Sequence, residues 1–339
     1  MQVDEIEADD RNRPEAVVGK FFKRPMQFEI VTNPYPVSAS PLDTWSEDNI
    51  PSIVVQGEWS DDVENFVRQN QVQGLYLNTA NGWTGTEYGF LDRLDWLQLL
   101  DVLSGEKINL FPVSRLSNLR RLRITSGGGA RINFAALNAL KRCSLRWWTG
   151  ARSVFECGAL ESLSIDRLPA KESEGLTRLQ NLRDLTIYSQ SITSLNSIAH
   201  LTNLQKLELN RFRNLKSLDG IENLQSLRSL TINECDRLSD LAPLSALTNL
   251  EHLVVSDWGT IDTLAPIVAL KKLRALSFSG ARTTIADGDL SPLDELPQLS
   301  MLMFGPRRHY SHKLIKHWDW NNFDNPDSLL ARKKRETSR

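Results

Sequence analysis

Three histidines near the end of the chain, His309, His312 and His317, come closest in type and spacing to a metal site. A separation of three residues can place two imidazoles on one face of a helix, where both could bind zinc. No cluster of Cys, Asp or Glu accompanies them to complete a ligand set. We therefore interpret these histidines as polar surface, and the sequence predicts no metal or other cofactor.

Two further features could suggest nucleotide binding or catalysis. The run Gly127-Gly-Gly129 lacks the G-x-x-x-x-G-K-[ST] frame of a phosphate loop, so it predicts a turn. The three cysteines, Cys143, Cys157 and Cys235, are too few and too scattered for a disulfide framework or a zinc site, and they fit a reducing compartment. No sequence signature relates a Cys or Ser to a histidine base. We therefore expect that the chain is not an enzyme.

The most informative charged residues are arginines. Nine Lys or Arg residues and no Asp or Glu lie between Arg115 and Arg152. Arginine presents a planar fork that matches carboxylate or phosphate geometry. Trp147 and Trp148 lie in the same stretch, and Trp with Arg is the composition of an interface hot spot. The stretch favours binding to an anionic surface; the alternative is a solvated basic face with one tryptophan turned into the core.

The elements that position these residues follow from a repeat, Leu-x-x-Leu-x-x-Leu-x-Leu, with good copies at Leu179, Leu201 and Leu224. Its last three letters predict a short strand with two apolar residues on one side. We call the first strand residue of each copy the marker. Nine markers span 176 residues with a mean period of 22, and they are Leu100, Leu122, Cys143, Leu163, Leu185, Leu207, Leu230, Leu253 and Leu276.

Looser copies at Ile53, Leu75 and Leu302 extend the array to about twelve coils. One such coil can bury its leucines only against the coils on either side. Cys143 and Cys157 occupy leucine positions, so we expect both to be buried and inert. The segments between strands carry Leu241-Ala-Pro243 and similar phrases, and proline suits the first turn of a short helix.

Phrases such as Leu218-Asp-Gly-Ile-Glu-Asn-Leu224 and Ala246-Leu-Thr-Asn-Leu250 resemble the internalin-like, 22-residue class of leucine-rich repeats. The resemblance implies an α/β solenoid: a horseshoe or arc with a parallel concave β-sheet, about twelve coils and terminal caps. It also implies protein recognition, in settings that include host interaction, toxin neutralisation and regulation of phosphatases.

One departure from that class concerns the bend after each strand. The class usually places Asn, or sometimes Cys, five residues after the marker, where the side chain satisfies backbone groups. Here Cys235 fits and Gln190 is a plausible substitute, but Trp148 and Trp258 occupy two of the other positions. The asparagine ladder is therefore essentially absent from these positions, and we expect irregular bends.

The ends of the chain differ from its middle. We predict a disordered acidic tail over residues 1–15, an amino-terminal cap over 16–50, the repeat domain over 51–305, a carboxyl-terminal cap over 306–330 and a basic tail over 331–339. The tail contains Arg332-Lys-Lys-Arg335, which we interpret as solvated, the alternative being a nucleic-acid, targeting or membrane-surface role.

The binding surface is expected on the concave side, where strand residues beside the buried pair point outward. Arginines two apart on a strand share a face, and strands about 4.8 Å apart bring neighbours into one patch. An acidic and aromatic zone follows the arginine zone along the array. The predicted partner-binding residues are Arg121, Arg123, Arg142, Arg146, Trp147, Trp148, Asp166, Asp184, Tyr188, Lys206, Glu208 and His252.

These features favour a non-catalytic protein-interaction module that binds an acidic or mixed-charge protein through its concave face. The chain has no apolar run long enough for a membrane span, and its acidic start is unlike a secretory signal, so we expect a bacterial, cytoplasmic regulator, inhibitor or toxin-neutralising protein. One alternative is nucleic-acid binding through the stretch from Arg115 to Arg152, and another is a secreted host-interaction effector. The sequence does not predict the oligomeric state.

Overall fold

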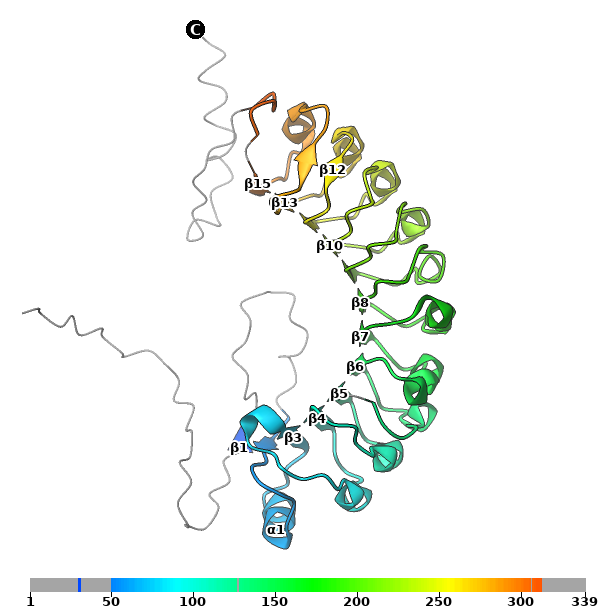
Figure 1. The fold of residues 1–339 in the computed structure, drawn as a ribbon, viewed down its shortest axis with the longest axis vertical. Coiled ribbons are helices and arrows are strands. Elements are labelled where there is room, and N and C mark those ends of the chain that lie inside the picture. Colours follow the sequence, from blue (N-terminus) through cyan, green and yellow to red (C-terminus); the bar gives the residue numbers. More distant parts are fainter. Residues whose placement is uncertain (1–29, 32–49, 127, 306, 313–339) are drawn as a thin grey trace, which may run out of the picture.

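The computed structural model describes residues 30–31, 50–126, 128–305 and 307–312. They form a curved array of coils in which the strands line the inner side and short helices cover the outer side (Figure 1). Twelve of the thirteen strands in the main sheet are parallel, and β1 alone is antiparallel to its neighbour. The predicted solenoid with a parallel concave sheet is confirmed.

The strands of the main sheet follow one another in chain order, with residues 30–31 at one end and residues 301–304 at the other. Their bounds are β1 (Ile30–Val31), β2 (Ser52–Val54), β3 (Gly74–Asn78), β4 (Leu99–Leu103), β5 (Arg121–Thr125), β6 (Arg142–Arg146), β7 (Ser162–Asp166), β8 (Asp184–Tyr188), β9 (Lys206–Asn210), β10 (Ser229–Asn233), β11 (His252–Ser256), β13 (Ala275–Ser279) and β15 (Met301–Phe304). A second sheet of two strands contains β12 (Thr260–Ile261) and β14 (Thr284–Ile285).

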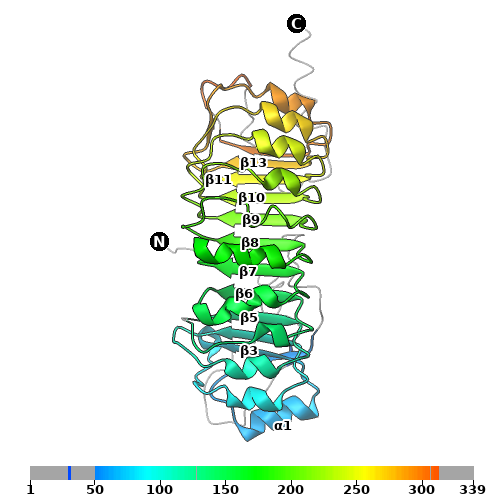
Figure 2. The same ribbon diagram turned by 90° about the vertical axis from the view of Figure 1, so that its right-hand side faces the viewer.

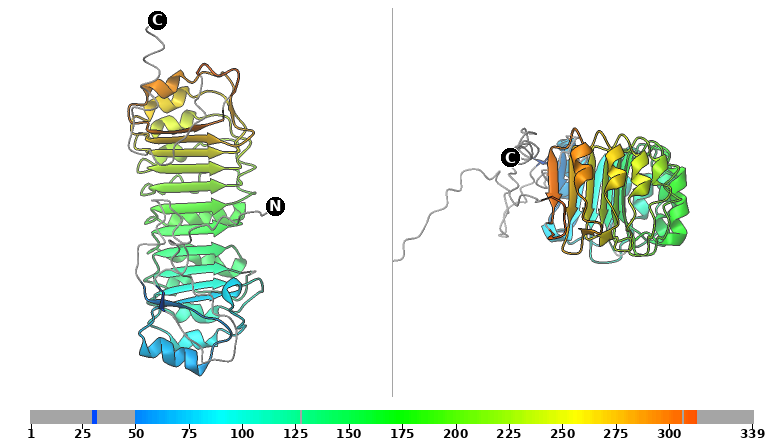
Figure 3. Two further views of the ribbon diagram at one scale, coloured as in Figure 1. Left: turned by 90° about the vertical axis from the view of Figure 1, so that its left-hand side faces the viewer. Right: turned by 90° about the horizontal axis from the view of Figure 1, so that it is seen from above.

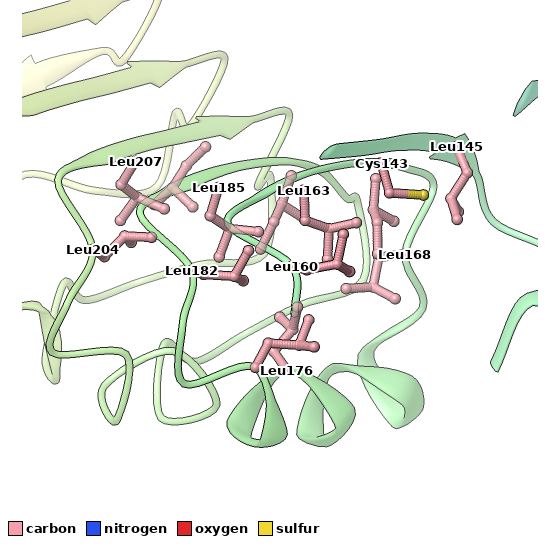
Figure 4. Close-up of a cluster of buried hydrophobic side chains, with 14 of the residues drawn as sticks. Cys143, Leu145, Leu160, Leu163, Leu168, Leu176, Leu182, Leu185, Leu204 and Leu207 are labelled. Carbon is pink, nitrogen blue, oxygen red and sulfur yellow. The ribbon is translucent and has the colours of Figure 1, made fainter. Parts of the chain in front are cut away.

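The register of the main sheet follows the markers. Leu185 lies opposite Leu163 on one side and Leu207 on the other, and Leu230 continues the row. Cys143 occupies the same position between Leu122 and Leu163 and is fully buried. Because each marker faces the markers of adjacent coils, the leucines stack into one continuous core along the array (Figure 4).

The return segments are short, as their sequence requires. Figure 2 shows these helices side by side on the convex surface. The described part of the chain has one α-helix, α1 (Asp61–Gln69), whose first turn is capped by Ser60. The 3-10 helices are η2 (Thr79–Asn81), η3 (Gly89–Arg93), η4 (Phe111–Arg115), η5 (Phe134–Ala136), η6 (Thr149–Glu156), η7 (Ala170–Arg178), η8 (Ile221–Asn223), η9 (Ala242–Ala246), η10 (Ala265–Ala269) and η11 (Ser291–Glu295).

Proline is the second residue of several of these helices, in the first turn as predicted. Pro243, Pro266 and Pro292 stand in the first turn of η9, η10 and η11, where a missing N–H costs no hydrogen bond. Among the helices of the described residues, none is long and apolar enough to cross a bilayer.

Indole groups replace part of the missing asparagine ladder. Trp148 donates from Nε1 to the carbonyl of Ala130 at 3.2 Å, and Trp258 donates in the same way to Leu238, in each case one coil back. Both acceptors lie eight residues after the marker of their coil. The two tryptophans therefore satisfy backbone carbonyls at the bend, as an asparagine would.

The bends themselves share a conformation in four coils. Arg167, Arg211, Glu234 and Asp257 each stand four residues after a marker, and their φ angles are 62°, 62°, 53° and 49°. The expectation of irregular bends is wrong for these coils, because one left-handed residue turns the chain at the same point of each.

A second ladder uses asparagines before the strands. Asn118, Asn181, Asn203 and Asn249 each stand four residues before a marker, and each donates from Nδ2 to a backbone carbonyl of the preceding coil at 2.7 to 3.0 Å. These residues belong to the Asn-Leu pairs that precede the strands. The ladder fixes the spacing of neighbouring coils at the edge where the strands begin.

Candidate functional site

The concave surface is the inner face of the main sheet, whose strands are seen in Figure 3, left. Three rows of outward-facing residues run along it. The first row lies one residue before each marker, the second row one residue after it, and the third row three residues after it. In β8 the first, second and third rows are Asp184, Thr186 and Tyr188, all partly exposed, whereas Leu185 and Ile187 between them are buried. The predicted direction of these side chains is thus confirmed for this strand.

The four predicted arginines lie on two adjacent strands, but they are not equivalent. Arg121 and Arg142 face each other in the first row across β5 and β6. Arg121 is only 3% exposed, whereas Arg142 is partly exposed. Arg123 and Arg146 lie in the second and third rows and are partly exposed. The structure therefore places the four residues on one face, with Arg121 beneath the surface.

The stretch between Arg115 and Arg152 contains no acid of its own, but acids on neighbouring coils form ion pairs with it. Five of its nine cations form ion pairs one coil away, namely Arg115–Asp92 at 2.5 Å, Arg123–Asp101 at 3.3 Å, Lys141–Glu161 at 2.8 Å, Arg146–Asp166 at 3.7 Å and Arg152–Glu172 at 2.5 Å. The acids stand some 20 to 23 residues away in sequence, so a linear scan of the stretch does not find them.

Asp101 is a site residue that the sequence analysis missed. It stands one residue after the marker Leu100 and lies opposite Arg123 in the second row. Burial raises the pKa of Asp101 to about 6, and the Arg123 guanidinium opposes this rise. Applying the same count, one residue after the marker, to β4 as well as to β5 identifies Asp101 from the sequence.

The third row contains a compact mixed-charge group. Arg146, Asp166 and Tyr188 occupy the same register position on β6, β7 and β8. The Arg146 guanidinium lies 3.7 Å from the Asp166 carboxylate, and both side chains are more than a third exposed. Burial raises the pKa of Tyr188, and the carboxylates of Glu208 and Asp166 act in the same direction. We call Arg146, Asp166 and Tyr188, together with Glu208 in the second row of β9, the central band.

The remaining predicted polar residues surround this band. Asp184, Lys206 and His252 belong to the first row of β8, β9 and β11. Glu208 accepts a hydrogen bond from Nδ2 of Asn210 at 3.0 Å. Burial lowers the pKa of His252, which favours its neutral form on a half-buried part of the face.

The two predicted tryptophans contribute to the core. The Trp147 ring stacks on Phe155 with centroids 5.5 Å apart, and Trp148 bonds to Ala130 at the bend. Both rings are partly buried against the core. The alternative interpretation of the sequence turned one tryptophan into the core. In the structure both rings pack against it.

The residues considered for chemistry have structural roles where the structure describes them. Burial raises the pKa of Cys143 above its usual range, and raises that of Cys157 to about 11 and of Cys235 to about 12, so all three thiols stay protonated. His309 bonds to the carbonyl of Ile285 at 2.8 Å, and His312 lies 3.2 Å from Asp294. The described residues contain no metal-binding group of His, Cys, Asp and Glu, and His317 lies outside them.

The described part of the glycine run contains a left-handed residue followed by a parallel bridge from Gly129 to Ile108 of the preceding coil. Gly128 has a φ of +85°, and a Cβ on Gly129 would lie 1.7 Å from the carbonyl oxygen of Ile108. Gly127 lies outside the described residues. The close approach of Gly129 to the preceding coil explains why glycine is needed there.

No protein-family model matches the chain, and no curated protein matches its sequence. Its fold is similar to that of an internalin from Listeria monocytogenes, which is 20% identical with a TM-score of 0.52 over 76% of this chain and 87% of that one. A leucine-rich repeat protein from Leptospira interrogans is 18% identical, with a TM-score of 0.50 over 76% of this chain and 78% of that one. Identities this low show a shared fold alone. The chain therefore has the leucine-rich repeat fold in its internalin-like form.

Proposed function

We propose that the chain is a non-catalytic protein-interaction module that binds a protein partner of mixed charge across its concave face. The fold supports this proposal because a curved solenoid presents an extended inner surface that can follow a convex partner. The finer parts of the proposal are a bacterial, cytoplasmic setting and a role as a regulator, inhibitor or toxin-neutralising protein. These parts rest on the cysteine content of the chain and on the fold resemblance.

The central band is the observation that carries the proposal. It offers a cation, two carboxylates and a phenol on four adjacent strands. Arg146 and Asp166 lie 3.7 Å apart and are solvent-exposed, so their ion pair contributes little free energy. Either side chain can therefore leave the other and pair with a charged group of a partner. Tyr188 adds a rigid ring with a polar end, which is typical of interface hot spots.

The ion pairs favour a protein over a nucleic acid as the partner. A phosphate backbone requires cations that can be neutralised by phosphate, with release of counterions. Five of the nine cations between Arg115 and Arg152 already have carboxylate partners on this chain. A mixed-charge protein surface can pair with both members of these ion pairs.

The test places a photo-crosslinking amino acid at Tyr188 in the full chain and identifies adducts formed in native lysate. The matched control replaces Phe111, an aromatic residue that is 49% exposed on the convex side in η4. We expect a discrete protein adduct from position 188 and none from position 111. Equal adducts from both positions, or adducts removed by nuclease, would contradict the proposal.

A further inference from the structure

A polar groove crosses the edge of the sheet at which the strands begin. It has a volume of about 400 Å³ and extends from the coil of β6 to the coil of β10. At about 4.8 Å between strands it is about 19 Å long, the length of about six residues of extended chain. Its walls are Lys141, Ala159, Glu161, Asn181, Arg183, Asn203, Gln205 and Ser226.

Arg183 lies at the middle of this groove, and Glu161 holds the equivalent position one coil back. Arg183 stands two residues before the marker Leu185, and its backbone N–H donates to the backbone carbonyl of Glu161 one coil back. The cations on either side along the same edge are paired, Lys141 with Glu161 at 2.8 Å and Arg228 with Glu251 at 3.0 Å. Among the described residues no carboxylate forms an ion pair with Arg183, whose side chain is exposed.

Two asparagines give the groove acceptors of fixed orientation. Asn181 and Asn203 each donate from Nδ2 to a backbone carbonyl of the preceding coil, at 2.7 and 3.0 Å. These bonds hold each amide plane and leave its Oδ1 to accept. The same ladder shows what such an oxygen can bind, because Oδ1 of Asn249 accepts from Nζ of Lys272 at 2.6 Å.

We propose that this groove binds an extended acidic peptide segment of a partner protein. A carboxylate of the segment pairs with the Arg183 guanidinium, and peptide N–H groups donate to Oδ1 of Asn181 and Asn203. A peptide supplies both the anion and the donors, whereas the backbone of single-stranded DNA supplies phosphate acceptors and no donor. The groove lies at the sheet edge, and its binding is independent of the central band.

The test measures fluorescence anisotropy of a labelled octapeptide of alternating Asp and Gly with the full chain. Arg183→Gln removes the guanidinium, and we expect about tenfold weaker binding, the loss of one charge-assisted pair. Arg178→Gln is the matched control, because Arg178 is also exposed, lies outside the groove in η7 and has no ion pair among the described residues. Binding by this variant is expected to match that of the unaltered chain.

A second probe tests the asparagine acceptors at constant charge. An octapeptide of alternating Asp and N-methylglycine lacks half of the N–H donors, and we expect it to bind more weakly than the Asp-Gly peptide. Four outcomes would overturn the proposal: no binding of the Asp-Gly peptide, equal loss in both arginine variants, equal binding of the N-methylated peptide, or equal binding of an oligothymidylate with the same charge.

Discussion

Asp101 shows how a single carboxyl group can limit stability on the concave face. Its surface is 5% exposed, and the Arg123 guanidinium lies 3.3 Å away. Burial nevertheless raises its pKa to about 6, so the desolvation of the carboxylate outweighs the attraction of the cation. The folded chain therefore holds the proton more tightly than the unfolded chain does.

This shift predicts a pH-dependent effect of Asp101→Asn. The wild-type carboxyl stabilises the fold most below about pH 4 and loses that contribution as pH rises through about 6. The neutral amide avoids the loss, so the variant should be more stable than wild type by about 3 kcal/mol at pH 7.5 and by only about 0.5 kcal/mol at pH 4. Urea unfolding at the two pH values measures this. Destabilisation at pH 7.5 would mean that the ion pair outweighs the cost of burial.

At the scale of the element, the tryptophans at two bends have the same bond but different surroundings. Trp258 is fully buried, whereas Trp148 is partly exposed. Replacing either by Phe removes the indole donor and leaves a backbone carbonyl without it. We expect Trp258→Phe to cost about 2 to 3 kcal/mol, because the carbonyl of Leu238 stays buried and a small cavity forms.

Trp148→Phe is the matched comparison, and it should cost only about 1 kcal/mol since water can reach the carbonyl of Ala130 more easily. Chemical denaturation of the two variants gives both values. Equal losses would show that the indole bond, and not burial of its acceptor, determines the cost.

The strands could be predicted from the sequence because their signal is local. Leu185 and Ile187 lie two residues apart, and the same pair returns in the next coil as Leu207 and Leu209. The bend could not be predicted, because Trp148 carries out by its indole N–H what the repeat class assigns to an amide. The position of the acceptor carbonyl in the preceding coil decides this, and residue type does not give that position.

The charge of the concave face was harder to predict for a related reason. Arg123 and Asp101 stand 22 residues apart in the sequence but opposite each other in the sheet. Charge counted along the chain therefore exaggerates the basic character of a coil, whereas charge counted across strands at one register position finds the pairs. The register of the markers was enough to predict that Arg146, Asp166 and Tyr188 lie on one face. In the structure they occupy the same register position on adjacent strands.

At the scale of the whole molecule, the coils separate three surfaces. The convex side is covered by short helices (Figure 2). The concave side presents the central band, and the edge where the strands begin carries the groove around Arg183. Because the concave side and the edge meet at the first row, one protein could contact both. The variants at Tyr188 and Arg183 then report on separate parts of the same complex.

The balance of charge over the molecule predicts how binding responds to salt. The net charge of the chain is −2, and most cations between Arg115 and Arg152 have carboxylate partners. We expect the affinity for the protein crosslinked at Tyr188 to fall by less than about tenfold between 50 and 200 mM salt, whereas contacts with six to ten phosphates would lose roughly a thousandfold or more. Titration calorimetry at both salt concentrations measures the slope, with Tyr188→Ala as the variant that should weaken binding equally at each. The ion pairs already occupy most of the cations that counterion release on that scale requires. A phosphate-like slope would therefore mean that these pairs open on binding and that the partner of the concave face is a polyanion.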